Sequence, residues 1–268
     1  MEPGAVKAPD GAGTVEGEGE GVTGSVGKGD IADAAGSAGD AGGADVAGAA
    51  GTRRRRRRTI GRRLLEFDRG LGVRWVAGAD EAGRGCLAGP LVAAAVLLDL
   101  ERIGPREVRA LAELNDSKQH DEAARESLFP VVMRVAAKVA IVSRCAGGID
   151  SRGLHRTNLA ALRDALIRVA RPGCVCLVDG FAVPAMGHEQ RAIVDGDATS
   201  AAIAAASILA KVSRDRFMRR ADELHPGWEF AAHVGYSTPE HRAAILRQGV
   251  SPLHRLSFQS TAYQQLAL

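Results

Sequence analysis

The chain has 268 residues, of which 25% are charged and 46% hydrophobic, and its formal net charge is +3. The longest apolar run, residues 91–98, is far too short to span a bilayer, so the sequence predicts no membrane-spanning helix. The four cysteines form no CxxC pair, and we expect them to be reduced. The first residues lack the basic leader and apolar run of a secretory signal, which favours a cytoplasmic protein.

The N-terminal part differs in composition from the rest of the chain. Residues 1–51 consist almost entirely of Gly, Ala, Val, Asp, Glu and Ser, without aromatic residues or apolar periodicity. Such a segment buries too little apolar surface to offset the entropy lost on ordering. Arginines fill residues 53–58 and recur at Arg62 and Arg63. We therefore expect a disordered tail over residues 1–63 and one folded domain over residues 64–268.

The tail has an acidic part followed by a short basic part. Residues 1–50 contain nine acidic residues and two lysines, and eight arginines follow, which leaves the body from Leu64 onward at about +2. The net charge is thus weak evidence that the body binds nucleic acid. The arginine run could hold phosphate non-specifically, or it could be a solvated spacer.

Apolar runs and turn residues predict strands and helices along the body of the chain. Strands are expected at residues 75–80, 91–98, 135–144, 174–178 and 191–194, and helices at residues 119–134, 154–169, 199–223 and 238–249. Residues 201–210 are small and apolar on every side, so this part of its helix should be buried. The order of elements indicates an α/β fold with a mixed sheet flanked by helices and a C-terminal helical portion.

Four carboxylates are expected where predicted strands end or a helix begins: Asp80, Glu81, Asp179 and Asp197. Grouped carboxylates raise one another's pKa values, and a divalent metal ion removes the repulsion. Mg²⁺ prefers carboxylate oxygen and retains waters, which leaves room for a phosphate. Each acid also has a simpler interpretation: a helix cap for Asp197, a turn for Asp179 and a polar strand end for the other two.

Several sequence blocks together resemble the ribonuclease HII family. They cover about residues 73–259 in order and read ADEAGRG (79–85), AGP (88–90), LNDSK (114–118), VDG (178–180), GD (196–197), AAASILAKVSRD (204–215), HVGY (233–236) and HRLSF (254–258). The resemblance implies an RNase H-like fold for residues 64–268, with Mg²⁺ or Mn²⁺ as cofactor. It also implies endonucleolytic cleavage of the RNA strand in RNA–DNA hybrids and at single ribonucleotides in duplex DNA, leaving 3′-hydroxyl and 5′-phosphate ends.

The resemblance also assigns roles to individual residues. Asp80, Glu81, Asp179 and Asp197 match the catalytic, metal-binding carboxylates. The substrate-binding positions are Gly83, Arg84 and Gly85 in the loop that recognises the ribonucleotide, Ser117, Lys118 and Lys211 near the phosphates, and Tyr236, which stacks on the sugar. Val234 departs from the family, since many relatives carry a lysine there.

Other interpretations remain open at this stage. Lys211 could pair with Asp215 one helical turn later, and Tyr236 could be an ordinary half-buried aromatic residue. The same fold could serve a DNA nuclease such as a resolvase, or a nucleic-acid-binding homologue without activity. The ribonucleotide loop and the presence of all four acids favour the ribonuclease, which we expect to be a monomer.

Overall fold

The computed structural model describes residues 58–258 and 260–266, so nearly all of the expected tail lies outside the described residues. Its five strands are β1 (Trp75–Ala82), β2 (Leu91–Asp99), β3 (Lys138–Arg144), β4 (Cys174–Asp179) and β5 (Glu189–Ile193). They form one sheet in the order β3-β2-β1-β4-β5. Neighbours are antiparallel from β3 to β1 and parallel from β1 to β5. The predicted mixed sheet is confirmed.

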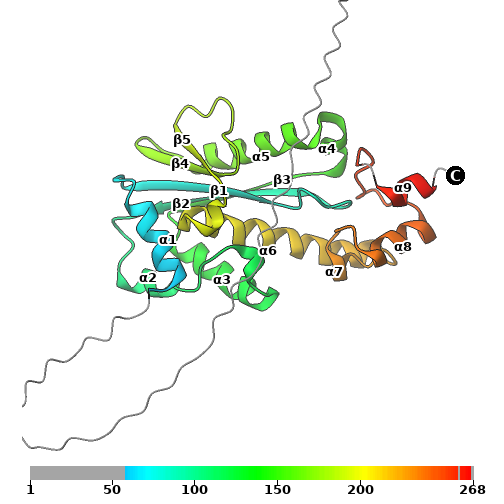
Figure 1. Ribbon diagram of the computed structural model, residues 1–268, viewed down its shortest axis with the longest axis horizontal. Coiled ribbons are helices and arrows are strands. Elements are labelled where there is room, and N and C mark those ends of the chain that lie inside the picture. Colours follow the sequence, from blue (N-terminus) through cyan, green and yellow to red (C-terminus); the bar gives the residue numbers. More distant parts are fainter. Residues whose placement is uncertain (1–57, 259, 267–268) are drawn as a thin grey trace, which may run out of the picture. The chain divides into compact units, whose positions relative to one another are not determined.

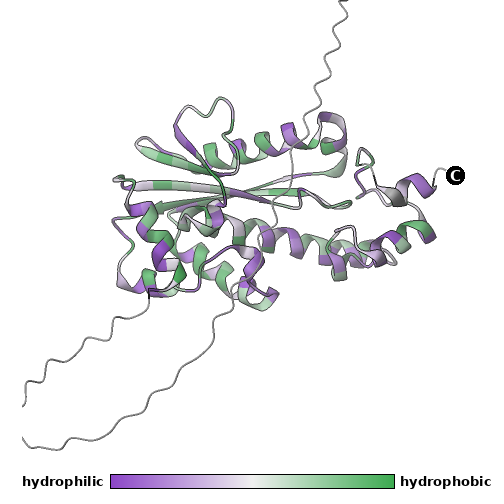
Figure 2. Ribbon diagram, in the orientation of Figure 1, coloured by the Kyte–Doolittle hydropathy of each residue, from purple (hydrophilic) through white to green (hydrophobic). Residues whose placement is uncertain are grey.

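Helices cover both faces of the sheet. Helix α5 (Leu154–Val169) packs on one face, next to the short α4 (Ala146–Arg152). The other face is covered by α6 (Ala201–Leu224), with α1 (Ile60–Arg69), α2 (Pro105–Ala110) and α3 (Glu122–Val135) outside it (Figure 1). Helices α1, α3 and α5 each carry both purple and green residues, as expected of helices with one buried and one exposed side (Figure 2). None of the described helices is both long and apolar enough to cross a bilayer.

The first half of α6 lies directly against β1. Every residue from 201 to 210 is buried, as the small apolar side chains of this stretch predict. The close approach depends on Gly78 in β1, because a Cβ there would collide with the backbone of Ala202 and Ile203. Small residues on both elements thus bring the start of α6 against the strand that carries Asp80.

The C-terminal part of the chain forms the predicted helical portion. Helices α7 (Phe230–His233), α8 (Pro239–Gln248) and α9 (Thr261–Leu266) continue from the far end of α6 (Figure 1). The loop between β1 and β2 reaches this portion. In that loop Leu87 N donates to Gly235 O at 2.9 Å, and Ala88 forms a β-bridge with His254. Two segments about 150 residues apart in sequence are therefore joined.

Some elements differ from the sequence prediction. Helix α1 begins at Ile60, four residues before the expected domain start at residue 64, because Leu64 and Leu65 are buried while Arg62 lies on the exposed side. Strand β5 covers residues 189–193 rather than 191–194, and it is an exposed edge strand rather than a buried one. Strand β3 begins at Lys138, since α3 continues to Val135. The thiols of Cys174 and Cys176 are free, as expected, with their sulfurs 3.8 Å apart.

Candidate active site

Three of the four predicted carboxylates meet at one cavity. Strands β1 and β4 are parallel, with Ala79 opposite Val178, so the next residues, Asp80 and Asp179, emerge at the same end of the sheet. Together with Glu81 they line a cavity of about 230 Å³. The other lining residues are Ala82, Gly83, Arg84, Gly85, Ser117, Lys118, Ser207, Lys211 and Tyr236. All seven of the predicted substrate-binding residues are among them.

The fourth carboxylate, Asp197, lies at the edge of this group. It is buried in the short 3₁₀ helix η2 (Gly196–Ala198), just before α6. Its Oδ2 is 3.5 Å from Nζ of Lys118, which lines the cavity and lies 3.9 Å from Asp116. Lys118 therefore connects Asp197 to the other three acids.

Backbone hydrogen bonds fix two of the carboxylates. Asp179 Oδ1 accepts from the N–H of Gly196 at 2.8 Å, and Asp80 Oδ1 accepts from the N–H of Glu81 at 2.7 Å. A Cβ at Gly196 would lie 2.6 Å from Ile203 and 3.1 Å from the Asp179 oxygen. The glycine thus allows the turn before α6 to approach the end of β4.

Three of the acids, Asp80, Glu81 and Asp197, are in an environment that disfavours their negative charge. Burial, and then the charges of Glu81 and Asp179, raise the pKa of Asp80 well above its usual value. Burial also raises the pKa of Glu81. For Asp197, burial and the neighbouring Asp116 raise the pKa to about 6. A cation in the cavity would relieve this cost, because it favours the ionised form of each acid.

The chemistry of the donor set fits a hard divalent ion. Carboxylate oxygens are the ligands that Mg²⁺ and Mn²⁺ prefer, and no histidine or cysteine lines this cavity. Within the described part of the chain, no three Asp, Glu, His or Cys side chains converge closely enough to hold one ion. Coordination of one ion by three of these acids would therefore require their carboxylates to come closer together.

The glycine loop and Tyr236 line the same cavity as the acids. Gly83 has a φ of +86°, and a Cβ there would collide with the side chain of Arg214. At Gly85 the position of a missing Cβ is open, so the backbone there is accessible to a ligand. Nη1 of Arg84 is 3.8 Å from Glu81. Tyr236 is 42% exposed, so its ring is available for stacking.

The three predicted phosphate-binding residues lie in different surroundings. Ser117 is buried and its hydroxyl accepts from Ser207 Oγ at 2.7 Å, whereas the side chain of Lys118 is 81% exposed. Lys211 donates to Asp215 at 2.9 Å, which is the ion pair that the sequence allowed. It also faces the cavity, with Nζ 5.4 Å from the centre of the Tyr236 ring. The ion pair therefore does not remove Lys211 from the site.

Sequence reasoning missed the groups that hold these loops. Arg214 is fully buried and donates to the carbonyls of Ala88 and Pro90 at 3.0 Å and of Val234 at 2.8 Å. Arg255, also fully buried, donates to Gly89 O and to Arg84 O. Both arginines occur in the sequence blocks quoted above, but the sequence analysis assigned no role to either. The sequence alone could not show that these two arginines are buried.

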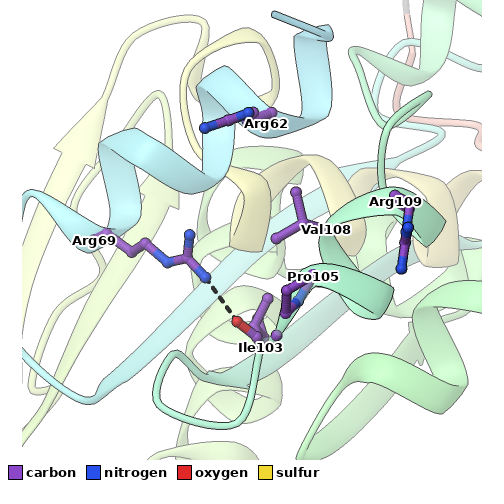
Figure 3. Close-up of a pocket in the computed structure, with 7 residues that line it drawn as sticks. Arg62, Arg69, Ile103, Pro105, Val108 and Arg109 are labelled. Carbon is purple, nitrogen blue, oxygen red and sulfur yellow. Dashed lines mark hydrogen bonds between the residues drawn. The ribbon is translucent and has the colours of Figure 1, made fainter.

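A second cavity, of about 420 Å³, lies between α1 and α2. Its lining residues are Arg62, Arg69, Ile103, Gly104, Pro105, Val108 and Arg109, none of them a predicted site residue. In Figure 3 the Arg69 side chain reaches the Ile103 carbonyl, at 2.7 Å. This cavity offers cations and no carboxylate, so it is unsuited to hold a metal ion.

A mixed sheet with carboxylates on neighbouring strands and at the start of a covering helix defines an RNase H-like protein. The family model for ribonuclease HII matches residues 77–261. The ribonuclease HII of Mycobacterium avium is 48% identical over 206 residues, which are 75% of this chain and 86% of that one. That of Mycobacterium tuberculosis H37Rv is 49% identical over 201 residues, 74% of each chain. The chain therefore belongs to the ribonuclease HII family.

Solved structures agree with this fold. The ribonuclease H2 from Pyrococcus horikoshii has a TM-score of 0.59 at 24% identity, over 72% of this chain and 96% of that one. Bst-RNase HIII in complex with Mn²⁺ has a TM-score of 0.56 at 20% identity, over 75% of this chain and 72% of that one. Family membership makes the chain a ribonuclease H, an endonuclease that degrades RNA in RNA–DNA hybrids. Enzymes of this family depend on a divalent metal ion.

Proposed function

We propose that the enzyme also cuts at single ribonucleotides embedded in duplex DNA, by hydrolysis that uses two metal ions, Mg²⁺ or Mn²⁺, held by Asp80, Glu81, Asp179 and Asp197. One observation carries the proposal: three of these acids line the same cavity as the Gly83–Gly85 backbone and the Tyr236 ring. When bound, such ions activate a water and stabilise the leaving oxygen of a phosphodiester. The products would carry 3′-hydroxyl and 5′-phosphate ends.

The remaining residues would bind and orient the substrate. An exposed 2′-hydroxyl is the group that distinguishes RNA from DNA, and the open backbone at Gly85 allows close approach to it. The half-exposed ring of Tyr236 would stack on the neighbouring sugar or base. The exposed amine of Lys118 and that of Lys211 would hold phosphates beside the cut. We also propose that the enzyme acts as a monomer.

The proposal places the enzyme in ribonucleotide excision from DNA in the cytoplasm. A DNA nuclease on the same fold remains the competing function, and its substrate would be a duplex without ribonucleotides. The Gly83–Gly85 loop beside the acids favours the ribonuclease, since cleavage of all-DNA duplexes would not need a 2′-hydroxyl sensor.

A cleavage assay on three duplexes of equal length tests this function. The first is a continuous RNA–DNA hybrid, the second is DNA with one ribonucleotide, and the third is all DNA. We expect cutting of the first two with Mg²⁺ or Mn²⁺, none of the third, and none with chelator. Cleavage of the all-DNA duplex would support the competing nuclease, and an intact single-ribonucleotide duplex would limit the enzyme to longer hybrids.

A further inference from the structure

Three buried histidines lie beneath the loop that carries Tyr236. His233 ends α7, His241 lies in α8 and His254 follows α8, and their exposed fractions are 7%, 0% and 3%. The rings of His233 and His241 stack with centroids 4.1 Å apart. The buried Phe230 ring is nearly perpendicular to both, at interplanar angles of 83° and 82°. None of these residues belongs to the proposed cleavage site, so their arrangement calls for a separate explanation.

Hydrogen bonds define the proton positions in this cluster. A backbone carbonyl can only accept, so His241 Nδ1 must donate to Tyr236 O, 2.8 Å away. His241 Nε2 is then an acceptor, and it lies 3.1 Å from Nε2 of His254, which must donate. His254 Nδ1 in turn accepts from the N–H of Ser251 at 2.8 Å. One arrangement of neutral tautomers satisfies the whole chain of contacts from Ser251 to Tyr236.

The neutral state agrees with the surroundings of the two rings. Burial is the main cause that lowers the pKa of both His241 and His254 to about 4, and the neighbouring His233 contributes to the same shift. A second proton on His241 would set two N–H groups against each other at the contact with His254. The chain of donors and acceptors is therefore stable at neutral pH.

The held segment has an unfavourable backbone conformation. Val234 has a φ of +43°, which is costly for a β-branched residue, and Gly235 follows at +83°. His233 Nδ1 accepts from the N–H of Gly235 at 3.1 Å, and Arg214 donates to Val234 O. Such a conformation persists only where its surroundings determine it, and the bond from His241 fixes the next carbonyl, that of Tyr236.

We infer that His241, oriented by His254, is a positioning residue that sets the direction of the Tyr236 ring in the cavity. The inference rests on the function proposed for Tyr236. It assigns to the C-terminal portion a specific task in recognition, which is to hold the aromatic ring in the cavity that the acids line, through a single backbone carbonyl.

Two variants of His241 separate this task from general support of the fold. The amide of Asn reaches about as far as Nδ1 of histidine, whereas the amide of Gln reaches about as far as Nε2. His241→Asn therefore retains a donor for Tyr236 O, and His241→Gln retains only the contact with His254. Both variants remove the same buried ring and keep an amide, so their thermal stabilities should fall alike.

The test measures kcat/KM on the single-ribonucleotide duplex for both variants, in the parent and in a Tyr236→Ala background. We expect His241→Gln to be about fivefold to tenfold slower than His241→Asn, the effect of one hydrogen bond on a buried group. In the Tyr236→Ala background the two should agree within about twofold, because the ring that His241 directs is gone. Mn²⁺ affinity should be equal in all four proteins.

Equal kcat/KM values for the two variants in the parent background would overturn the inference. So would a ratio of kcat/KM between His241→Asn and His241→Gln that is the same in both backgrounds. A Tyr236→Ala protein with parental activity would instead refute the role proposed for Tyr236 itself. If a His241 variant does not fold, His254 supplies the same comparison with the order reversed. There Gln retains the donor to His241 and Asn does not, so His254→Gln must be the faster variant for the inference to hold.

Discussion

Tyr236 is the exposed aromatic side chain of the site, and its environment is partly charged. Its ring lies 5.4 Å from Nζ of Lys211 and 5.9 Å from the guanidinium carbon of Arg214, and burial raises the pKa of its hydroxyl. The phenol therefore stays protonated at neutral pH and can donate a hydrogen bond. A ring held in this way offers both a stacking face and a donor to a ribose.

Removing the ring should weaken cleavage at the junction. We expect Tyr236→Ala to cost about 1–3 kcal/mol of transition-state stabilisation, the usual value of one stacked base, which is roughly tenfold to more than a hundredfold in rate. Tyr236→Phe keeps the ring and should lose only the contribution of the hydroxyl. The measurement is kcat/KM on the single-ribonucleotide duplex, with Mn²⁺ affinity as control. If the alanine variant had parental activity, Tyr236 would be an ordinary half-buried aromatic residue without a role in recognition.

Individual site residues could be predicted from the sequence to different degrees. Asp80, Glu81 and Asp179 directly follow or end apolar runs, so their place at one end of the sheet followed from the strand pattern. The contact of Asp197 with Lys118 could not be predicted, because Lys118 lies in a short 3₁₀ helix (Ser117–Gln119) about 80 residues earlier. The histidine cluster was missed for the same reason: its contacts arise from the packing of α7 and α8.

At the scale of elements, the contact between α1 and α6 is a feature that the sequence did not indicate. Asp68, near the end of α1, is fully buried, and its Oδ2 accepts from the N–H of Ala202 at the start of α6 at 2.9 Å. Burial raises the pKa of this carboxyl to about 7. Its effect is larger than that of the hydrogen bonds from Ser200 and Ala202, which lower the pKa. The acid therefore ties α1 to the helix that follows Asp197.

This carboxyl should make stability depend on pH in a defined direction. Its folded pKa of about 7 exceeds the ordinary value of 3.8, so the folded state binds more protons between these values. The free energy of unfolding should therefore fall as pH rises from about 4 to about 7, by on the order of a few kcal/mol from this group, and then level off. Asp68→Asn, which stays neutral, should lack this contribution.

The measurement is denaturant unfolding of the parent and Asp68→Asn at several pH values, in chelator. Because the other acids are common to both proteins, the difference between the two curves isolates Asp68. As pH rises from about 4 to about 7, we expect the free energy of unfolding to fall less for Asp68→Asn than for the parent. Parallel curves would mean that Asp68 has an ordinary pKa and does not link α1 to α6 through a protonated acid.

The errors in predicting elements have local causes. Arg62 and Arg63 continue the arginine run, so the first turn of α1 was assigned to the tail, although Leu64 and Leu65 are buried. Helix α4 contains Gly147 and Gly148, which usually indicate a loop. Strand β5 is short and lies at the edge of the sheet, so its apolar residues are not a sign of burial. The long helices α5 and α6 were predicted closely.

At the scale of the whole molecule, the fold brings together groups from both ends of the domain. The sheet supplies Asp80, Glu81 and Asp179, the turn before α6 supplies Asp197, and the C-terminal portion supplies Tyr236. The fold class followed from the order of strands and helices and from the family resemblance, and the structure confirms it. The disordered state expected for the tail stays a prediction, because residues 1–57 lie outside the described residues.

At this scale too, the carboxylates at the end of β1 and β4 are proposed to hold the metal ions that cleavage requires. The most direct measurement compares Asp80→Asn, Asp179→Asn and Asp195→Asn for Mn²⁺ affinity and for cleavage of the single-ribonucleotide duplex. Asp195 is an exposed neighbour of the site with a φ of +51°, a conformation that asparagine tolerates, so it is the matched control.

We expect the first two variants to fold, to bind Mn²⁺ more weakly and to lose about a thousandfold or more in rate, since a metal ligand contributes several kcal/mol to the transition state. Asp195→Asn should retain both properties of the parent. Near-parental, metal-dependent cleavage by Asp80→Asn and Asp179→Asn would contradict the assignment of the metal site to these carboxylates.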